Sequence, residues 1–152
     1  MITVRKAILS DAHLIYDIYE KDGDLADFPN VMVDLEEELS RIDTRVVWIA
    51  LDGDQPVGTV ALVLDNWQKD LADGETIAMV KRLRVREDYR GRGVSRMLND
   101  ALEDEARKLG FQRLSIEVSG SNIHAKNIYE HWGYKFFRIG YRIDELALTK
   151  PL

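Results

Sequence analysis

A glycine-rich loop that leads directly into an amphipathic helix constrains this sequence more than any other feature. An apolar run ends at Val85, and residues 90–95 follow, where Gly91 and Gly93 alternate with arginines. Apolar residues then recur at the spacing of one helix face until Gly110, which is a typical stop signal. The pattern predicts a strand, a tight turn and a helix in direct succession.

The start of this helix suits an anion. A helix that begins at a glycine loop presents unpaired N–H groups and the positive end of its dipole to whatever lies above it. Taken alone, the loop is more often an ordinary turn with two surface arginines, because short glycine motifs are common. It is not a P-loop, since no Gly-Lys-Ser/Thr follows, and it lacks the third glycine of the dinucleotide fingerprint.

A second unit of strand, turn and helix follows the first. Residues 114–118 form an apolar run, residues 119–121 read as a turn, and Ser121 or Asn122 can cap the next helix. One face of that helix carries Ala125, Ile128, Tyr129 and Trp132. We therefore expect Tyr129 to point toward the protein body or a cleft, and a core aromatic is the ordinary alternative.

Together the two units resemble the GNAT superfamily of acyl-CoA-dependent N-acyltransferases. The segment L-R-V-R-E-D-Y-R-G-R-G-V looks like the pyrophosphate loop of that family, R-x-x-G-x-[G/A] read from Arg90. Ser95 stands where the family often has Gly or Ala, but serine is small and keeps its N–H. The second motif, N-x-x-A-x-x-x-Y-x-x-x-G-[FY], is met by Asn122, Ala125, Tyr129, Gly133 and Tyr134.

The resemblance implies a site for acetyl-CoA as cosubstrate. In this family the sheet splays between the strand ending at Val85 and the strand ending at Val118. The pantetheine arm lies in that slot and pairs like an extra strand with the backbone near Leu83 and Val85. The implied cosubstrate contacts are Leu83, Val85, Arg90, Gly91, Arg92, Gly93, Val94, Ser95 and Asn122.

Acetyl transfer to an amine needs a base for the amine and a proton for the departing thiolate. Tyr129 is the candidate acid, because a phenol with a pKa of about 10 keeps its proton at neutral pH. Glu117 is the candidate base, and its distance of twelve residues from Tyr129 resembles that in bacterial ribosomal-protein N-terminal acetyltransferases. A structural strand glutamate is an equally weighted alternative, and Glu75 or solvent remain open as bases.

The composition excludes several other classes of protein. The chain has no cysteine, which rules out disulfides, thiolate metal sites and an acetyl-cysteine intermediate. No His or acid cluster has metal-ligand spacing, so no metal is expected. The net charge of −6 argues against a nucleic-acid binder. Since no long apolar stretch or signal-peptide pattern is present, we expect no membrane association and a cytoplasmic location.

The remaining pattern predicts an α/β fold as a single domain over residues 1–152. Helices are expected after the capping candidates Ser10 and Asp11, over 34–42, and in the two units above. Strands are expected at 2–7, 46–51, 56–64, 75–85, 114–118, 134–141 and 143–148. The order β-α-α-β-β-β-α-β-α-β-β suits a central, mostly antiparallel sheet, splayed between the fourth and fifth strands, with helices on both faces.

Two further features allow more than one interpretation. Lys81, Arg82, Arg84 and Arg86 alternate with apolar residues, which is typical of a solvated face, although such charges could also attract an anionic cosubstrate. Trp67 lies in a polar connection, and could line a binding wall, form an oligomer contact or cover the sheet edge.

The resulting hypothesis is an N-acetyltransferase that moves an acetyl group from acetyl-CoA to a primary amine by direct attack in a ternary complex. The acceptor stays open between a small amine, an amino acid and a protein N-terminus, and a homodimer stays open as well. The alternatives are a CoA-binding regulatory or structural module without turnover, and a generic α/β domain that binds no CoA.

Overall fold

A computed structural model describes all 152 residues of the chain. Seven strands form one mixed sheet in the order β1-β2-β3-β4-β5-β7-β6. The strands are β1 (Ile2–Lys6), β2 (Arg45–Asp52), β3 (Gln55–Val63), β4 (Ile77–Val85), β5 (Arg113–Ser119), β6 (Lys135–Ile139) and β7 (Glu145–Pro151). Every neighbouring pair is antiparallel except β4 and β5, which are parallel. The predicted order of elements and the mixed sheet are confirmed.

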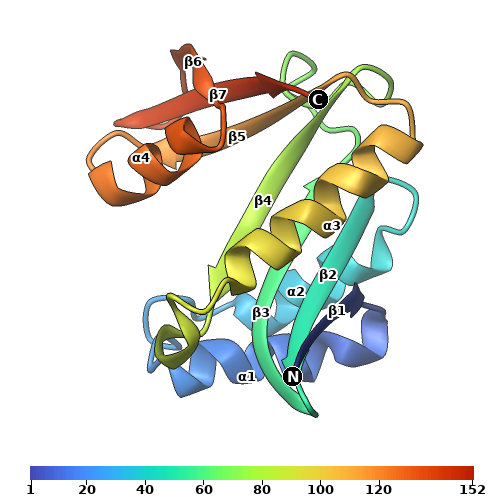
Figure 1. Ribbon diagram of the computed structural model, residues 1–152, viewed down its shortest axis with the longest axis vertical. Coiled ribbons are helices and arrows are strands. Elements are labelled where there is room, and N and C mark those ends of the chain that lie inside the picture. The colour runs from blue at the N-terminus through green and yellow to red at the C-terminus, as the bar shows by residue number, and fades with distance from the viewer.

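Helices cover both faces of this sheet, as predicted. They are α1 (Ala12–Lys21), α2 (Val31–Ser40), α3 (Val94–Lys108) and α4 (Ile123–His131), with short 3₁₀ turns at η1 (Leu9–Asp11) and η2 (Glu87–Tyr89). Apolar residues of α3 pack on one face together with part of α4, while α1 and α2 form a second core on the opposite face. Figure 1 shows α3 crossing the sheet in front of β2 and β3, with α1 and α2 behind.

The sheet opens between β4 and β5. The two strands pair only from Ile77 with Arg113 to Val80 with Ile116. Beyond that point β4 continues to Val85 and β5 continues to Ser119 without pairing with each other. Figure 1 shows the two strands diverging toward their C-terminal ends. The splay that the resemblance implied is therefore present, and it leaves one edge of β4 with unpaired backbone.

A β-bulge lies in the part of β4 that pairs with β3 but no longer with β5. Ala61 of β3 faces Lys81, but Thr59, two residues away, faces Arg84, so β4 contains one extra residue. Arg82 has a φ of 55°, which is uncommon for a residue other than glycine. A bulge bends the strand and redirects its backbone groups. The sequence carried no signal for it, because arginine is not selected for positive φ.

Several predicted boundaries were wrong by a few residues. The strand expected from Glu75 begins at Ile77, because the carboxylate of Asp73 accepts hydrogen bonds from the N–H groups of Glu75, Thr76 and Ile77 and forms a turn there. Glu75 is thus an exposed turn residue. The helix expected at 34–42 spans Val31–Ser40, and the last strand begins at Glu145.

The capping role considered for Asp11 was also wrong. Its carboxylate accepts a hydrogen bond from the N–H of Ile8, at 2.8 Å, and pairs with Arg5 of β1. No side chain caps the start of α1. Asp11 therefore fixes the end of β1 against the turn that precedes the helix. Asn122, in contrast, accepts from the N–H of Ala125 and caps α4 as expected.

The polar connection between β3 and β4 covers part of the sheet. Leu71 and Ala72 are fully buried against Met79 of β4 and Ala147 of β7. The hydroxyl of Ser115 in β5 donates a 2.6 Å hydrogen bond to the carbonyl of Leu71. The connection thereby closes the face of the sheet opposite α3 near the base of the splay. None of the helices is long and apolar enough to span a bilayer.

Candidate active site

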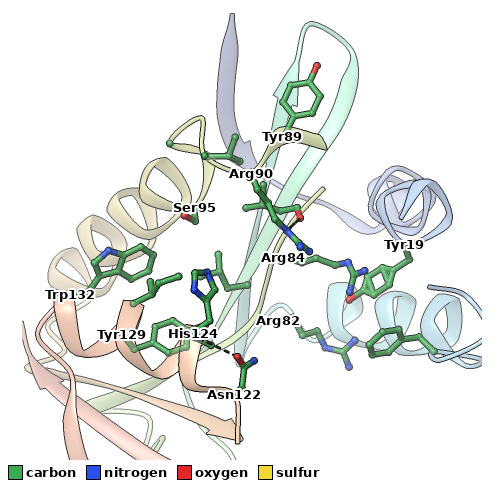
Figure 2. Close-up of a pocket in the computed structure, with 18 of the residues that line it drawn as sticks. Tyr19, Arg82, Arg84, Tyr89, Arg90, Ser95, Asn122, His124, Tyr129 and Trp132 are labelled. Carbon is green, nitrogen blue, oxygen red and sulfur yellow. Dashed lines mark hydrogen bonds between the residues drawn. The ribbon is translucent and has the colours of Figure 1, made fainter. Parts of the chain in front are cut away.

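The opening between β4 and β5 forms a cavity of about 860 Å³, called the first cavity below. Its walls come from the free edge of β4, the glycine loop, the start of α3, and α4, and it extends to α1 and α2. Figure 2 shows Tyr129 and Trp132 on one side of it and Arg84 and Tyr19 on the other. Segments far apart in the chain thus meet around one space at the splay.

Nearly all of the residues predicted to contact the cosubstrate line this cavity. They are Leu83, Val85, Arg90, Gly91, Gly93, Val94, Ser95 and Asn122. Arg92 is the exception. Its guanidinium stacks 4.5 Å from the ring centroid of Tyr89, whose hydroxyl donates to Asp52 at 2.6 Å. Arg92 therefore secures the outer side of the loop and does not line the first cavity.

The two glycines of the loop are required by backbone conformation. Gly91 and Gly93 have φ values of 79° and 81°, in the left-handed region that other residues rarely adopt. A Cβ at either position would meet no protein atom within 4 Å, so within the protein only the backbone conformation requires glycine. Gly93 immediately precedes α3, and Val94 and Ser95 at the start of this helix line the first cavity. The glycine loop therefore opens a helix beside the cavity, as the sequence predicted, and such a helix start suits an anion.

Tyr129 sits where the first cavity meets a second one. Its ring is half-buried and lies edge-on to Trp132 and Tyr134, at centroid distances of 6.0 and 5.9 Å. Burial raises the pKa of Tyr129, so the phenol keeps its proton well into the alkaline range. Ala125 and Trp132 pack toward the core with it, whereas Ile128 is more exposed and lines the first cavity.

The second cavity, of about 540 Å³, shares Arg82, Leu83, Asn122, Ala125 and Tyr129 with the first. Its other walls come from β4, β5, the connection between β3 and β4, and the turn before β7. Residues that line only this second cavity include Trp67, Gln68, Lys81, Glu117, Tyr141, Arg142 and Glu145. The candidate acid and the candidate base thus border the same space.

Glu117 is half-buried in the wall of the second cavity. Its Oε1 accepts a long hydrogen bond from Nε2 of Gln68, at 3.4 Å, and its Oε2 is buried without any partner. Burial raises the pKa of Glu117, the neighbouring carboxyl of Glu145 raises it further, and Gln68 and Lys81 oppose the shift to a lesser extent. A carboxyl that is not saturated by the protein and has a raised pKa suits proton transfer.

Trp67 forms an aromatic wall with Tyr141. Their ring centroids are 4.9 Å apart with an interplanar angle of 88°, yet the two residues are 67% and 77% exposed. Both line the second cavity. Leu71 and Ala72 cover the sheet instead of Trp67, which leaves the binding wall and the oligomer contact as the roles open for Trp67.

The expectation of a solvated basic face on β4 was wrong for most of its residues. Arg84 pairs with Asp22 and Asp24, Arg86 is buried and pairs with Asp88, and Lys81 is half-buried. Only Arg82 is exposed, and it lies 3.5 Å from a carboxylate oxygen of Glu38. Arg82 and Arg84 thus lie against the acidic segment around α1 and α2, which the sequence pattern of β4 alone does not reveal.

All three histidines are exposed. His124 of α4 borders the first cavity, as Figure 2 shows. No group of three or more His, Cys, Asp or Glu side chains is arranged to hold a metal ion.

The sequence pattern of the acetyltransferase (GNAT) family matches residues 12–134, and the chain belongs to this family. The match begins at α1 and ends just after α4, so it includes the glycine loop, both strands of the splay and Tyr129.

Individual relatives agree with this assignment. The chain is 34% identical to a mycothiol acetyltransferase from Beutenbergia cavernae over 60% of this chain and 29% of the relative. It is 32% identical to an uncharacterized acetyltransferase from Streptococcus pyogenes over 67% of this chain and 63% of the relative. The chain therefore spans less than two thirds of these relatives.

A solved structure shows the same fold over its full length. The PaiA N-acetyltransferase from Thermoplasma acidophilum, in complex with coenzyme A, superposes with a TM-score of 0.82 at 15% identity. The alignment covers all of this chain and 99% of that one. At this identity the likeness establishes the fold.

Proposed function

We propose that this chain transfers an acetyl group from acetyl-CoA to a primary amine, by direct attack within a ternary complex. One observation carries the proposal: the glycine loop at the start of α3, the free edge of β4 and Tyr129 all line the first cavity. A cosubstrate with a pyrophosphate at one end and a thioester at the other fits such a cavity. The complex of coenzyme A with the Thermoplasma acidophilum relative supports the choice of ligand.

The free edge of β4 would hold the pantetheine arm. Residues beyond Val80 have no partner on the β5 side, so an amide-containing chain can pair there like an added strand. Leu83 and Val85 are the residues on which we place this pairing. The bulge at Arg82 redirects the backbone beside them, so that an N–H group can polarise the thioester carbonyl.

The proton transfers are assigned to Glu117 and Tyr129. The acceptor enters as an ammonium ion, and Glu117 removes one proton, directly or through water. The amine nitrogen attacks the thioester carbonyl carbon, and the carbon–sulfur bond breaks. Tyr129 donates its phenolic proton to the departing sulfur. The second proton of the nitrogen restores the phenol of Tyr129 through solvent, and the proton on Glu117 is released to solvent. The products are the N-acetylated amine and free CoA, and one proton is released in total.

Two measurements test this proposal. Saturating CoA should raise the melting temperature, because a ligand at about one hundred times its Kd stabilises the native state by roughly 2.7 kcal/mol. Release of free thiol from acetyl-CoA should follow addition of amines from a panel that includes amino acids, aliphatic amines and peptides. Binding of CoA without turnover on any amine would favour the regulatory module, and no effect of CoA would contradict the cosubstrate site itself.

A further inference from the structure

Lys81 and Glu117 lie next to each other at the point where the sheet opens. Lys81 directly follows Val80, and Glu117 directly follows Ile116. Val80 and Ile116 are the last residues at which β4 and β5 pair with each other. Val80 and Ile116 both belong to the core under α3, so the next residue on each strand points to the opposite face. Lys81 and Glu117 accordingly both line the second cavity. The ammonium of Lys81 and the carboxylate of Glu117 thus occupy adjacent positions in the wall of the second cavity.

Neither Lys81 nor Glu117 forms an ion pair within the protein. Lys81 and Glu117 form no ion pair with each other, although Lys81 is close enough to lower the pKa of Glu117. The neighbouring arginines of β4, in contrast, form ion pairs. Arg82 pairs with Glu38, and Arg84 pairs with Asp22 and Asp24. Oε2 of Glu117 is buried without an N–H donor or a cation, and the nearby carboxyl of Glu145 can satisfy it only when one of the two carboxyl groups is protonated. Because such groups are normally satisfied, the arrangement indicates a ligand that supplies the missing partners.

We propose that the acceptor is a free α-amino acid with an aromatic side chain. Its ammonium would lie at Glu117 and its carboxylate at Lys81. The two charged groups of an α-amino acid are attached to one carbon, so they match two opposite charges on adjacent strands. This inference rests on the proposed N-acetyl transfer and specifies its acceptor.

The aromatic wall accounts for the side chain. Trp67 and Tyr141 are both largely exposed but contact each other edge to face at the rim of the second cavity. An aromatic ring packed against them would bury apolar surface on all three rings. A polyamine is less suited, because its distal ammonium groups would face Lys81, Arg82 and Arg142.

The chemistry is consistent with release of the product. Acetylation converts the ammonium into a neutral amide, and the proton taken by Glu117 leaves to solvent. The product retains its carboxylate but loses the charge that Glu117 would bind. The acetylated amino acid should therefore bind more weakly than the substrate.

A comparison of three acceptors tests the inference on the full chain with acetyl-CoA. They are phenylalanine, phenethylamine, which lacks the carboxylate, and alanine, which lacks the ring. We expect kcat/KM to be highest for phenylalanine, by about tenfold over phenethylamine, as for one charge-assisted hydrogen bond. Lys81→Met should abolish this preference, read as the ratio of kcat/KM for the two acceptors at one pH, because any change in the pKa of Glu117 acts on both acceptors alike. Lys135→Met, which replaces an exposed lysine of β6, should leave the ratio unchanged. Trp67→Ala should narrow the ratio of phenylalanine to alanine, and Trp67→Phe should largely restore it.

The outcomes separate this inference from the proposed function. Turnover of phenethylamine at or above the level of phenylalanine would overturn the inference while leaving N-acetyl transfer intact. The same holds if Lys81→Met folds normally and keeps the wild-type ratio. Absence of turnover with every amine, despite bound CoA, would remove the proposed function and the inference with it.

Discussion

The guanidinium of Arg84 lies 4.2 Å from the ring centroid of Tyr19 and forms ion pairs with Asp22 and Asp24. It therefore connects the end of β4, beyond its pairing with β5, to the end of α1 and the segment that follows α1. Phe28 contributes a second ring at 5.5 Å. One side chain thus fixes the segment that closes the first cavity opposite α4.

Replacement of Arg84 by alanine should destabilise the fold. Asp22 has a side chain only 3% exposed, so the variant would leave a buried carboxylate without its cation. Removing one partner of such a pair costs about 3 kcal/mol, measurable as the free energy of unfolding in urea. Arg96→Ala is the matched control. Arg96 and Asp100 form an ion pair in which each side chain is 61% exposed, so this pair should contribute little to stability. An equal loss in both variants would contradict the anchoring role.

Replacement of Gly93 by alanine should weaken CoA binding much more than it weakens the fold. The left-handed conformation strains alanine by about 1–2 kcal/mol, and relief of that strain turns the first N–H groups of α3 away from the cavity. We expect Kd to rise by about tenfold or more, which is roughly 1.4 kcal/mol by calorimetry.

Gly110→Ala provides the control for this strain. Gly110 has a φ of 89° with nothing within 4 Å of a Cβ, but it follows the far end of α3. The two variants should lose similar stability, and only Gly93→Ala should lose affinity. Similar Kd values in the two variants would mean that the loop does not hold the pyrophosphate.

Replacement of Tyr129 by phenylalanine should lower kcat by about 10²–10⁴-fold, as for loss of a general acid. The affinity for acetyl-CoA should change little, because the ring and its packing are retained. The control is Tyr134→Phe, which lies next to it but has a buried hydroxyl without a partner. That change should leave kcat unaltered and be neutral or stabilising, because it removes an unsatisfied polar group. If Tyr129→Phe turns over at the wild-type rate while the chemical step limits turnover, Tyr129 is not the acid.

Glu117 should give the pH dependence of kcat/KM an acidic limb. Its pKa is raised by burial and by Glu145, so activity should appear only above the pH at which an ordinary glutamate ionises. Glu117→Gln should abolish that limb and slow the reaction. Because the folded pKa lies above the unfolded one, Glu117 also lowers stability as pH rises through this range, and Glu117→Gln should remove that decline. An unchanged profile would leave solvent or another group as the base.

Local features of the chain predicted most of the framework. The period of apolar residues and the glycine stops gave the order of the elements, and the resemblance gave the splay. The positive φ of Gly93 and the cap formed by Asn122 follow directly from residue type. Boundaries were less accurate, since the start of β4 depends on the hydrogen bonds of Asp73.

The second cavity could not be predicted in the same way. Glu145 lies near Glu117 because β7 pairs with β5, and Trp67 meets Tyr141 across a long separation in sequence. The bulge at Arg82 arises from the pairing of β3 with β4 and not from a glycine. Each of these depends on tertiary contacts between distant segments, for which no local pattern exists.

The short pairing of β4 with β5 has a mechanical consequence. By backbone pairing, only the positions from Ile77 to Val80 join the strands β5, β7 and β6 to the rest of the sheet. A pantetheine arm on the free edge of β4 would act as a temporary strand and lengthen that seam. Binding of acetyl-CoA would then strengthen the connection between the two parts of the sheet, and departure of CoA would weaken it again in each catalytic cycle.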